Sequence, residues 1–302
     1  MNKWYIRLPL ILLGLLLALL LLVIGVFLID NRTNGRLVSA GEERRYLLYV
    51  PESYDPSVPT PLVITFHGLA QWPANQATVS RWNELADQYG FIVVYPAGTR
   101  LPMRWRTWDV PGATKEVTFI SDLIDKLSTE YNIDPTRIYA NGLSNGGGMS
   151  FVLSCKLSER IAAFGSVAGA YSFPWEQCDP SRPLPAILFH GTADPIVPYQ
   201  GGVAGPSGLL FPAIPDWVGE LARRNGCDET PQVLPDSGDV SSEEYSNCDG
   251  DVVFHTIAGG GHSWPGSDYL PRIIVGETTM DIDASRTMWE FFQQHPLSGE
   301  GE

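Results

Sequence analysis

The sequence predicts an α/β fold in which a mostly parallel, twisted sheet carries helices on both faces. Apolar runs of strand length alternate along the chain with stretches of helical periodicity, which is typical of such sheets. Several runs are bounded by Gly or Pro and lack polar alternation, as strands buried on both faces require. With 302 residues, of which 44% are hydrophobic, the chain can form one large domain with a sizeable core.

The first half of this domain begins with strands at 44–51 and 61–68, followed by a helix at 79–90 that ends at a Gly. A strand at 91–98 follows. Residues 116–132 form an amphipathic helix, because Val117, Ile120, Leu123, Ile124 and Leu127 share one face. A strand at 137–142 completes this half.

In the second half a helix is expected at 146–160, a strand at 183–191, a helix at 216–226 and a late strand at 252–259. The last helix covers 284–295, and Asp283 is placed to cap it. The Gly- and Pro-rich residues 199–215 form a stretch long enough to be a loop over a site. The expected organisation is a membrane anchor or signal segment at 1–30, a linker at 31–43, the catalytic domain at 44–296 and a tail at 297–302.

The stretch Leu8–Ile29 contains no charged residue. As a helix it would be roughly 33 Å long, enough to cross a hydrocarbon core of about 30 Å. Lys3 and Arg7 precede it and favour a cytoplasmic N-terminus, so the domain is expected outside the cytoplasm. The alternative is a cleaved secretory signal, whose apolar region is usually only about 7 to 15 residues long. Both interpretations predict export.

A formal charge of −14 argues against a nucleic-acid partner, because such proteins need clustered cations. Export favours disulfides for the four cysteines, which contain no CxxC pair. We predict Cys155 with Cys178 and Cys227 with Cys248; the alternative is four unpaired buried thiols.

The stretch Gly142-Leu143-Ser144-Asn145-Gly146 fits the G-x-S-x-G motif between a predicted strand and a predicted helix. A nucleophile on such a sharp turn needs neighbours without side chains, so that strand and helix can approach each other. The helix start then directs free N–H groups at an anion beside Ser144. A purely structural Gly- and Ser-containing turn is the alternative.

A serine nucleophile needs a base and an orienting carboxylate. Among the five histidines, His262 follows three glycines on a loop after the last strand, and Asp194 follows the strand at 183–191. These give the order Ser144, Asp194, His262 that an α/β-hydrolase requires. The backbone N–H groups of Leu69 and Asn145 are the predicted oxyanion hole. His67 is expected to brace that loop, and Trp264 is predicted to bind substrate.

The motifs HGLAQ, IDPTRIYANGLSNGGGMS, PLPAILFHGTADPIVPY, GGGHSWPG and DIDASRTMWEFF make residues 44–293 resemble the polyhydroxybutyrate depolymerase and feruloyl esterase branch of the α/β-hydrolases. The resemblance implies an α/β-hydrolase fold, the triad Ser144, Asp194 and His262, and locally paired cysteines. Many relatives have Cys where this chain has Leu69, which puts a disulfide at that loop in doubt.

The sequence therefore predicts an exported serine carboxylic ester hydrolase that forms an acyl-enzyme, without a metal or organic cofactor. Its substrate would be a polyester, a feruloylated or acetylated polysaccharide, or a small ester. A serine peptidase of the same fold and a non-catalytic binding protein are the alternatives. The sequence does not distinguish among the esters, and it does not give the oligomeric state.

Overall fold

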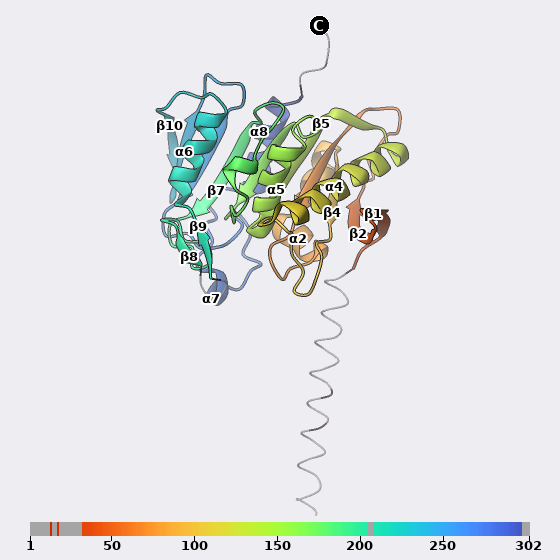
Figure 1. Cartoon of the computed structure of the whole chain (residues 1–302), viewed down its shortest axis with the longest axis horizontal. Helices are drawn as coiled ribbons and strands as arrows, with labels where there is room; N and C mark the ends of the chain where they lie inside the picture. Colours follow the sequence, from red (N-terminus) through yellow and green to blue (C-terminus); the bar gives the residue numbers. More distant parts are fainter. Residues whose placement is uncertain (1–12, 14–16, 18–31, 205–207, 298–302) are drawn as a thin grey trace, which may run out of the picture.

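The apolar runs of the sequence form the centre of one ten-stranded sheet (Figure 1). The computed structural model describes Leu13, Leu17 and residues 32–204 and 208–297. The strand order is β1-β2-β4-β3-β5-β6-β7-β12-β11-β10. The strands are β1 Gly35–Ser39, β2 Glu42–Tyr49, β3 Thr60–Phe66, β4 Ile92–Pro96, β5 Ile133–Leu143, β6 Ala163–Val167, β7 Ala186–Gly191, β10 Gln232–Ser237, β11 Val240–Tyr245 and β12 Val252–Ile257.

The six central strands, β4, β3, β5, β6, β7 and β12, are parallel, whereas the strands beyond them on each side pair antiparallel. Every residue of β3, β4, β6 and β7 is buried, as expected for strands covered on both faces. The predicted mostly parallel α/β sheet is confirmed. Because the central strands are parallel, the loops that follow β3, β5, β7 and β12 meet at one edge of the sheet.

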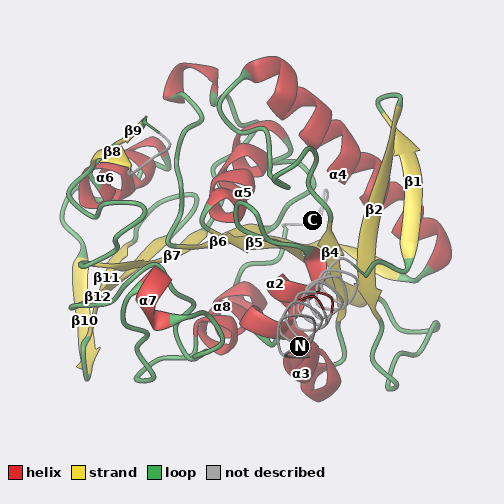
Figure 2. Cartoon of the chain, turned by 90° about the horizontal axis from the view of Figure 1, so that it is seen from below, coloured by secondary structure: helices red, strands yellow, loops and turns green. Residues whose placement is uncertain are grey.

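Helices cover both faces of the sheet (Figure 2). The residues that pack on one face come from α4 Val110–Glu130, α5 Asn145–Lys156 and α6 Ile214–Arg224. Those on the other face come from α2 Pro73–Ser80, α3 Trp82–Tyr89 and α8 Ala284–Gln294. The predicted cap of the last helix is confirmed, because the Asp283 side chain accepts a hydrogen bond from the Arg286 N–H.

The loops carry smaller elements. These are the 3₁₀ turn Trp175–Gln177, the short helix α7 Arg272–Val275, and the two-stranded pair β8 Gly202–Ala204 and β9 Leu209–Phe211. The last pair lies within 199–215, which the sequence predicts as a loop. In Figure 1, β8, β9 and α7 lie together at the lower left of the folded domain.

The predicted linker at 31–43 is wrong, because it contains β1. This strand forms a hairpin with β2 through Ala40 and Gly41, which both have positive φ. The pattern was missed because β1 is an edge strand with alternating exposure, held by main-chain pairing and not by an apolar run. The folded domain therefore begins before residue 44.

The predicted helix at 79–90 is also corrected. Arg81 adopts a left-handed conformation with φ of 56° and separates α2 from α3. The latter ends at Gly90, whose φ is 74°, as the sequence predicts. The tail predicted from residue 297 starts within the fold, because the Leu297 N–H donates to the Thr136 carbonyl.

The predicted membrane segment at 1–30 lies outside the described residues, apart from Leu13 and Leu17. Within the described part of the chain, no helix combines the length and the apolar character that crossing a membrane requires.

Both predicted disulfides are confirmed. Cys155 at the end of α5 pairs with Cys178, and Cys227 after α6 pairs with Cys248. Each bond closes a local loop, with partners 23 and 21 residues apart. In the chain-entropy description, a loop of this size stabilises the fold by about 3 kcal/mol. Disulfides of this kind persist in oxidising compartments.

Candidate active site

Ser144 lies on the sharp turn between β5 and α5. Its backbone has φ of 57° and ψ of −118°, a conformation that a non-glycine residue rarely adopts. Hydrogen bonds hold it there: the Ser144 N–H donates to the Val167 carbonyl, and the Ser144 carbonyl accepts from the N–H groups of Gly148 and Ala170. The side chain sits at the start of the helix, where the positive end of the helix dipole lies.

The two glycines of the motif are required by close backbone approach. A Cβ on Gly142 would lie 2.5 Å from the Gly146 carbonyl carbon, and a Cβ on Gly146 would lie 2.2 Å from the Phe66 carbonyl oxygen. Neither position has room for a side chain. This is the steric need that the motif predicts, and it allows β3, β5 and α5 to meet beside Ser144.

Asp194 lies on the loop after β7 and is 7% exposed. Its Oδ1 accepts hydrogen bonds from the N–H groups of Ile196 at 2.7 Å and Val197 at 2.8 Å. Its Oδ2 lies 2.7 Å from Nδ1 of His262. Burial by itself would raise the pKa of Asp194, but hydrogen bonds from His190 and His262 hold this pKa well below its usual range. The carboxylate is therefore ionised across the physiological range.

His262 lies on the loop after β12 and is 5% exposed. Its backbone N–H donates to the Val275 carbonyl at 2.5 Å. The preceding glycine is sterically required, because a Cβ on Gly261 would lie 2.0 Å from the same carbonyl oxygen. Since the Asp194 carboxylate can only accept, Nδ1 of His262 carries the proton, and Nε2 of a neutral ring is left free to accept one.

The strand order brings Ser144, Asp194 and His262 to the same sheet edge, after β5, β7 and β12. Within the described residues, His262 is hydrogen bonded to Asp194 but not to Ser144. The Ser144 to imidazole hydrogen bond of a hydrolase is often long in the absence of substrate. The arrangement thus presents a hydroxyl on a strained turn together with a carboxylate-oriented imidazole.

His190, which sequence reasoning did not assign, also contacts the carboxylate. It is 2% exposed, and its Nε2 lies 3.0 Å from the Val197 carbonyl oxygen and 3.3 Å from Asp194 Oδ2. His190 therefore helps to hold the loop from Asp194 to Val197 in place. Its position at the end of β7, four residues before Asp194, is the only signal that the sequence offers.

The predicted oxyanion donors come from two different loops. Among the described residues, nothing accepts a hydrogen bond from the Leu69 N–H. Asn145 is the first residue of α5, so the helix has no carbonyl for its N–H. The Leu69 loop is held on both sides of this residue, since the Gly68 N–H donates to the Gln71 side chain and the Ala70 N–H to the Met103 carbonyl.

His67 braces this loop, as expected. Its Nε2 accepts a hydrogen bond from the Gly98 N–H at 3.0 Å, and its Nδ1 lies 2.7 Å from the Gly68 carbonyl oxygen. Only the neutral ring with the proton on Nδ1 satisfies both contacts. Burial lowers the pKa of His67 to about 4. His67 is therefore a structural residue that stays neutral.

Acid should destabilise the fold between pH 6.5 and pH 4. His255 is also buried, and burial lowers its pKa to about 4 from an ordinary value of 6.5. In this window the unfolded chain binds protons at His67 and His255 that the folded chain does not, so stability falls as the pH falls. The loss is of the order of 3 kcal/mol per histidine. Urea unfolding at pH 7 and pH 4 should show a smaller loss for His255→Gln than for the wild type; equal losses would contradict this account.

The predicted substrate-binding role of Trp264 is wrong. Its side chain is 1% exposed and packs in the core on the α8 face of the sheet. The indole Nε1 donates to Ser285 Oγ at 3.1 Å. Although Trp264 is only two residues from His262 in sequence, its ring is buried in the core and is not available to a substrate.

The chain is similar to several proteins that are named as esterases. Residues 44–174 match the family model described as esterase PHB depolymerase. The chain is 36% identical over 160 residues to a bifunctional acetylxylan esterase/xylanase, XynS20E, of Neocallimastix patriciarum, covering 53% of this chain and 23% of that protein. It is 33% identical over 238 residues to feruloyl esterase B of Piromyces equi, covering 73% of this chain and 42% of that protein. The chain thus spans less than half the length of these two relatives.

Among solved structures, the acetyl xylan esterase from Aspergillus awamori superposes with a TM-score of 0.58 at 17% identity, covering 87% of this chain and 96% of that one. This similarity shows the shared α/β-hydrolase fold. Together with the fold, the family match and the esterase relatives show that the chain resembles the polyhydroxybutyrate depolymerase and feruloyl esterase branch of the α/β-hydrolases.

Proposed function

We propose that this protein is a serine carboxylic ester hydrolase that acts through an acyl-enzyme. The observation that carries the proposal is the 2.7 Å contact between Asp194 and His262 at the sheet edge where the strained Ser144 turn begins α5. A carboxylate, an imidazole and a hydroxyl in this order are the parts of a nucleophilic hydrolase. The names of the relatives support the same class of reaction.

In the first half of the reaction, Ser144 Oγ attacks the ester carbonyl carbon while Nε2 of His262 takes the hydroxyl proton. Asp194 stabilises the imidazolium through Nδ1–H. The tetrahedral oxyanion accepts hydrogen bonds from the N–H groups of Leu69 and Asn145, and it collapses as the alcohol leaves with the proton of His262.

In the second half, water attacks the acyl-enzyme carbonyl and gives its proton to His262. The second tetrahedral intermediate collapses, Ser144 recovers its proton from the imidazolium, and the carboxylic acid leaves. Apart from the ester and one water molecule, the steps use side chains and N–H groups of this chain, and the imidazole is neutral again at the end.

The substrate class that we propose is an ester of an acetylated or feruloylated polysaccharide, on the strength of the names of the two relatives. We also infer that the domain works outside the cytoplasm, held by the uncharged segment Leu8–Ile29. Two disulfides support export. Cleavage of the domain by protease added to intact cells tests this location, and full protection would contradict it.

An ester panel tests the activity. Purified protein should hydrolyse p-nitrophenyl acetate, and comparison of methyl ferulate with acetylated xylan should show which acyl group it prefers. A folded protein that hydrolyses none of these esters would overturn the proposed function.

A further inference from the structure

The side chain of Asn145, and not only its N–H group, has a defined role in the structure. Its Oδ1 accepts a hydrogen bond from the Trp105 N–H at 2.7 Å. Its Nδ2 donates to the Trp105 carbonyl and to Thr107 Oγ1, both at 3.2 Å. The residue after the nucleophile is therefore bound to the segment Trp105–Thr107, which precedes α4 and lies forty residues away in sequence.

Trp105 connects the same segment to the other predicted oxyanion donor. Its side chain is fully buried, and Nε1 donates to the His67 carbonyl at 3.0 Å. The indole also packs edge to face against Phe66, with ring centroids 5.0 Å apart. His67 is two residues before Leu69. One tryptophan thus contacts both loops that supply the N–H groups, with its backbone at Asn145 and its indole at His67.

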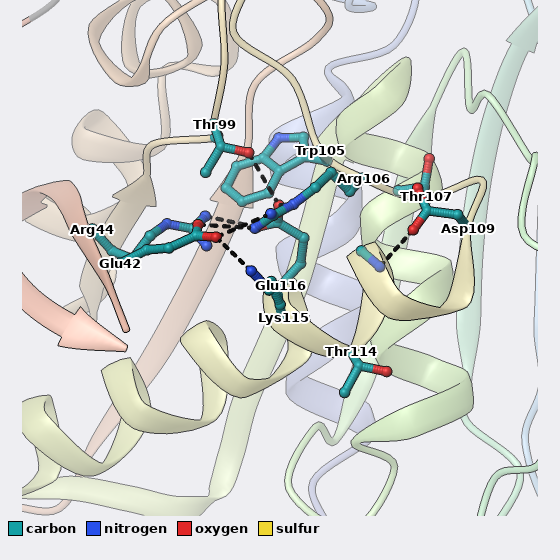
Figure 3. Close-up of polar contacts among 12 residues, drawn as sticks. Glu42, Arg44, Thr99, Trp105, Arg106, Thr107, Asp109, Thr114, Lys115 and Glu116 are labelled. Carbon is teal, nitrogen blue, oxygen red and sulfur yellow. Dashed lines mark hydrogen bonds and ion pairs between the residues drawn. The ribbon is translucent and has the colours of Figure 1, made fainter. Parts of the chain in front are cut away.

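An ion pair fixes this segment to α4 (Figure 3). Arg106 Nε lies 2.6 Å from Oε1 of Glu116, whose side chain is 0% exposed. The second oxygen of Glu116 lies 2.6 Å from Arg44 of β2. The remaining Arg106 nitrogens contact the Glu42 carboxylate at 3.2 and 3.3 Å. Arg106 is thereby held by two carboxylates, Glu42 and Glu116. Its neighbours Trp105 and Thr107 are restrained with it through the backbone.

The buried charges of Arg44, Arg106 and Glu116 are not explained by a gain in stability. A buried ion pair gains little over packed apolar side chains, because both charges must lose their water. Its distinctive property is fixed geometry: the short contacts from Glu116 to Arg106 and Arg44 define where the segment between β4 and α4 runs.

We propose that the segment Trp105–Thr107, anchored by the Arg106–Glu116 ion pair, positions the Leu69 and Asn145 N–H groups for the oxyanion. The proposal rests on the proposed function. None of Trp105, Arg106 and Glu116 touches the reacting atoms in this account; they act through the two donors. Displacement of a donor by about 1 Å can cost about 100-fold in rate.

Asn145→Ala tests the proposal because it keeps the N–H group and removes the three side-chain hydrogen bonds. We expect kcat for p-nitrophenyl acetate to fall by about 10- to 100-fold, while KM changes less than about threefold. The matched control is Asn225→Ala. Asn225 is buried, and its amide donates to the Leu184 and Gly250 carbonyls away from the site. The control should lose stability but keep the wild-type kcat.

Trp105→Phe provides a second variant that preserves the aromatic packing and removes only the bond to the His67 carbonyl. Its control is Trp82→Phe, since the Trp82 indole is also fully buried and donates to the Asn141 side chain at 3.0 Å. A trifluoromethyl ketone, whose hemiketal adduct with the serine places an oxyanion in the hole, gives a separate readout. Its inhibition constant should rise about as much as kcat falls for Asn145→Ala and Trp105→Phe, but not for the controls.

The outcomes separate the two proposals. One outcome is that the wild type hydrolyses esters while folded Asn145→Ala and Trp105→Phe keep the kcat and the inhibition constant of the wild type. That result would overturn the positioning role and leave the proposed hydrolase function standing. Equal losses in variants and controls would show a purely structural role and overturn it as well. A wild type that neither hydrolyses esters nor binds the ketone would overturn the proposed function and this inference together.

Discussion

Ser144→Ala is expected to reduce kcat for ester hydrolysis by about six orders of magnitude. The physical reason is that Ser144 supplies the hydroxyl on the strained turn at the sheet edge where Asp194 orients the His262 imidazole. The backbone at residue 144 keeps its bonds to Val167, Gly148 and Ala170, so the turn should persist. Hydrolysis of p-nitrophenyl acetate by purified wild type and variant measures the effect.

The fold of this variant should remain intact, with a free energy of unfolding within about 1 kcal/mol of the wild type. Ser154→Ala is the matched control, because Ser154 is a buried serine of the same helix whose Oγ donates to the Phe151 carbonyl. It should retain full activity. Retention of more than about 1% of wild-type kcat in Ser144→Ala would rule out this serine as the nucleophile.

Asp194→Asn should lower kcat by about 10³- to 10⁴-fold with little change in KM. The two N–H groups of Ile196 and Val197 require an acceptor, so they fix the amide oxygen of the variant at the Oδ1 position. The amide NH₂ then faces Nδ1 of His262. The ring must turn Nδ1 into an acceptor, its proton moves to Nε2, and the base can no longer take the proton of Ser144.

The control for this variant is Asp251→Asn, which alters another carboxylate and imidazole pair. Asp251 Oδ2 lies 3.3 Å from Nε2 of His295. Asp251 immediately precedes β12 and His295 is the C-cap residue of α8, so this pair lies at the end of β12 opposite to the edge that carries Ser144. Steady-state kinetics should show wild-type kcat for the control. If Asp194→Asn stays within tenfold of the wild type, Asp194 does not orient the base.

The candidate residues Ser144, Asp194 and His262 could be predicted because their signals are local. Each follows an apolar strand, and each is flanked by glycines or turn residues whose steric need is visible in the sequence. The structure shows the same need as overlaps that a Cβ on Gly142, Gly146 or Gly261 would create. The disulfides could be predicted for a related reason, since each joins cysteines only about twenty residues apart.

The contacts that the sequence did not indicate are long-range and polar. Arg44 meets Glu116 across 72 residues, and Asn145 meets Trp105 across 40. An Arg or a Glu in a sequence is usually exposed, so nothing marked Glu116 as fully buried. The prediction for Trp264 was wrong because it relied on distance in sequence. An aromatic residue two positions from the base suggested a binding surface, whereas residues of α8 bury the ring.

The edge of the sheet shows a third limit. The strand β1 has a half-exposed pattern, with Val38 75% exposed, and it pairs with β2 through the backbone. Hydrogen-bond pairing of this kind leaves little trace in apolar periodicity. Five of the six central parallel strands, in contrast, were identified from their apolar runs. The sixth, β6, was not predicted, because its sequence Ala-Phe-Gly-Ser-Val is short and contains a Gly and a Ser.

The most direct test of the account is the site at which a fluorophosphonate reacts with the wild-type protein, located by mass spectrometry of the digested adduct. One adduct is expected, on the peptide that contains Ser144. An adduct on a different residue, or no adduct on the folded protein at neutral pH, would contradict the account.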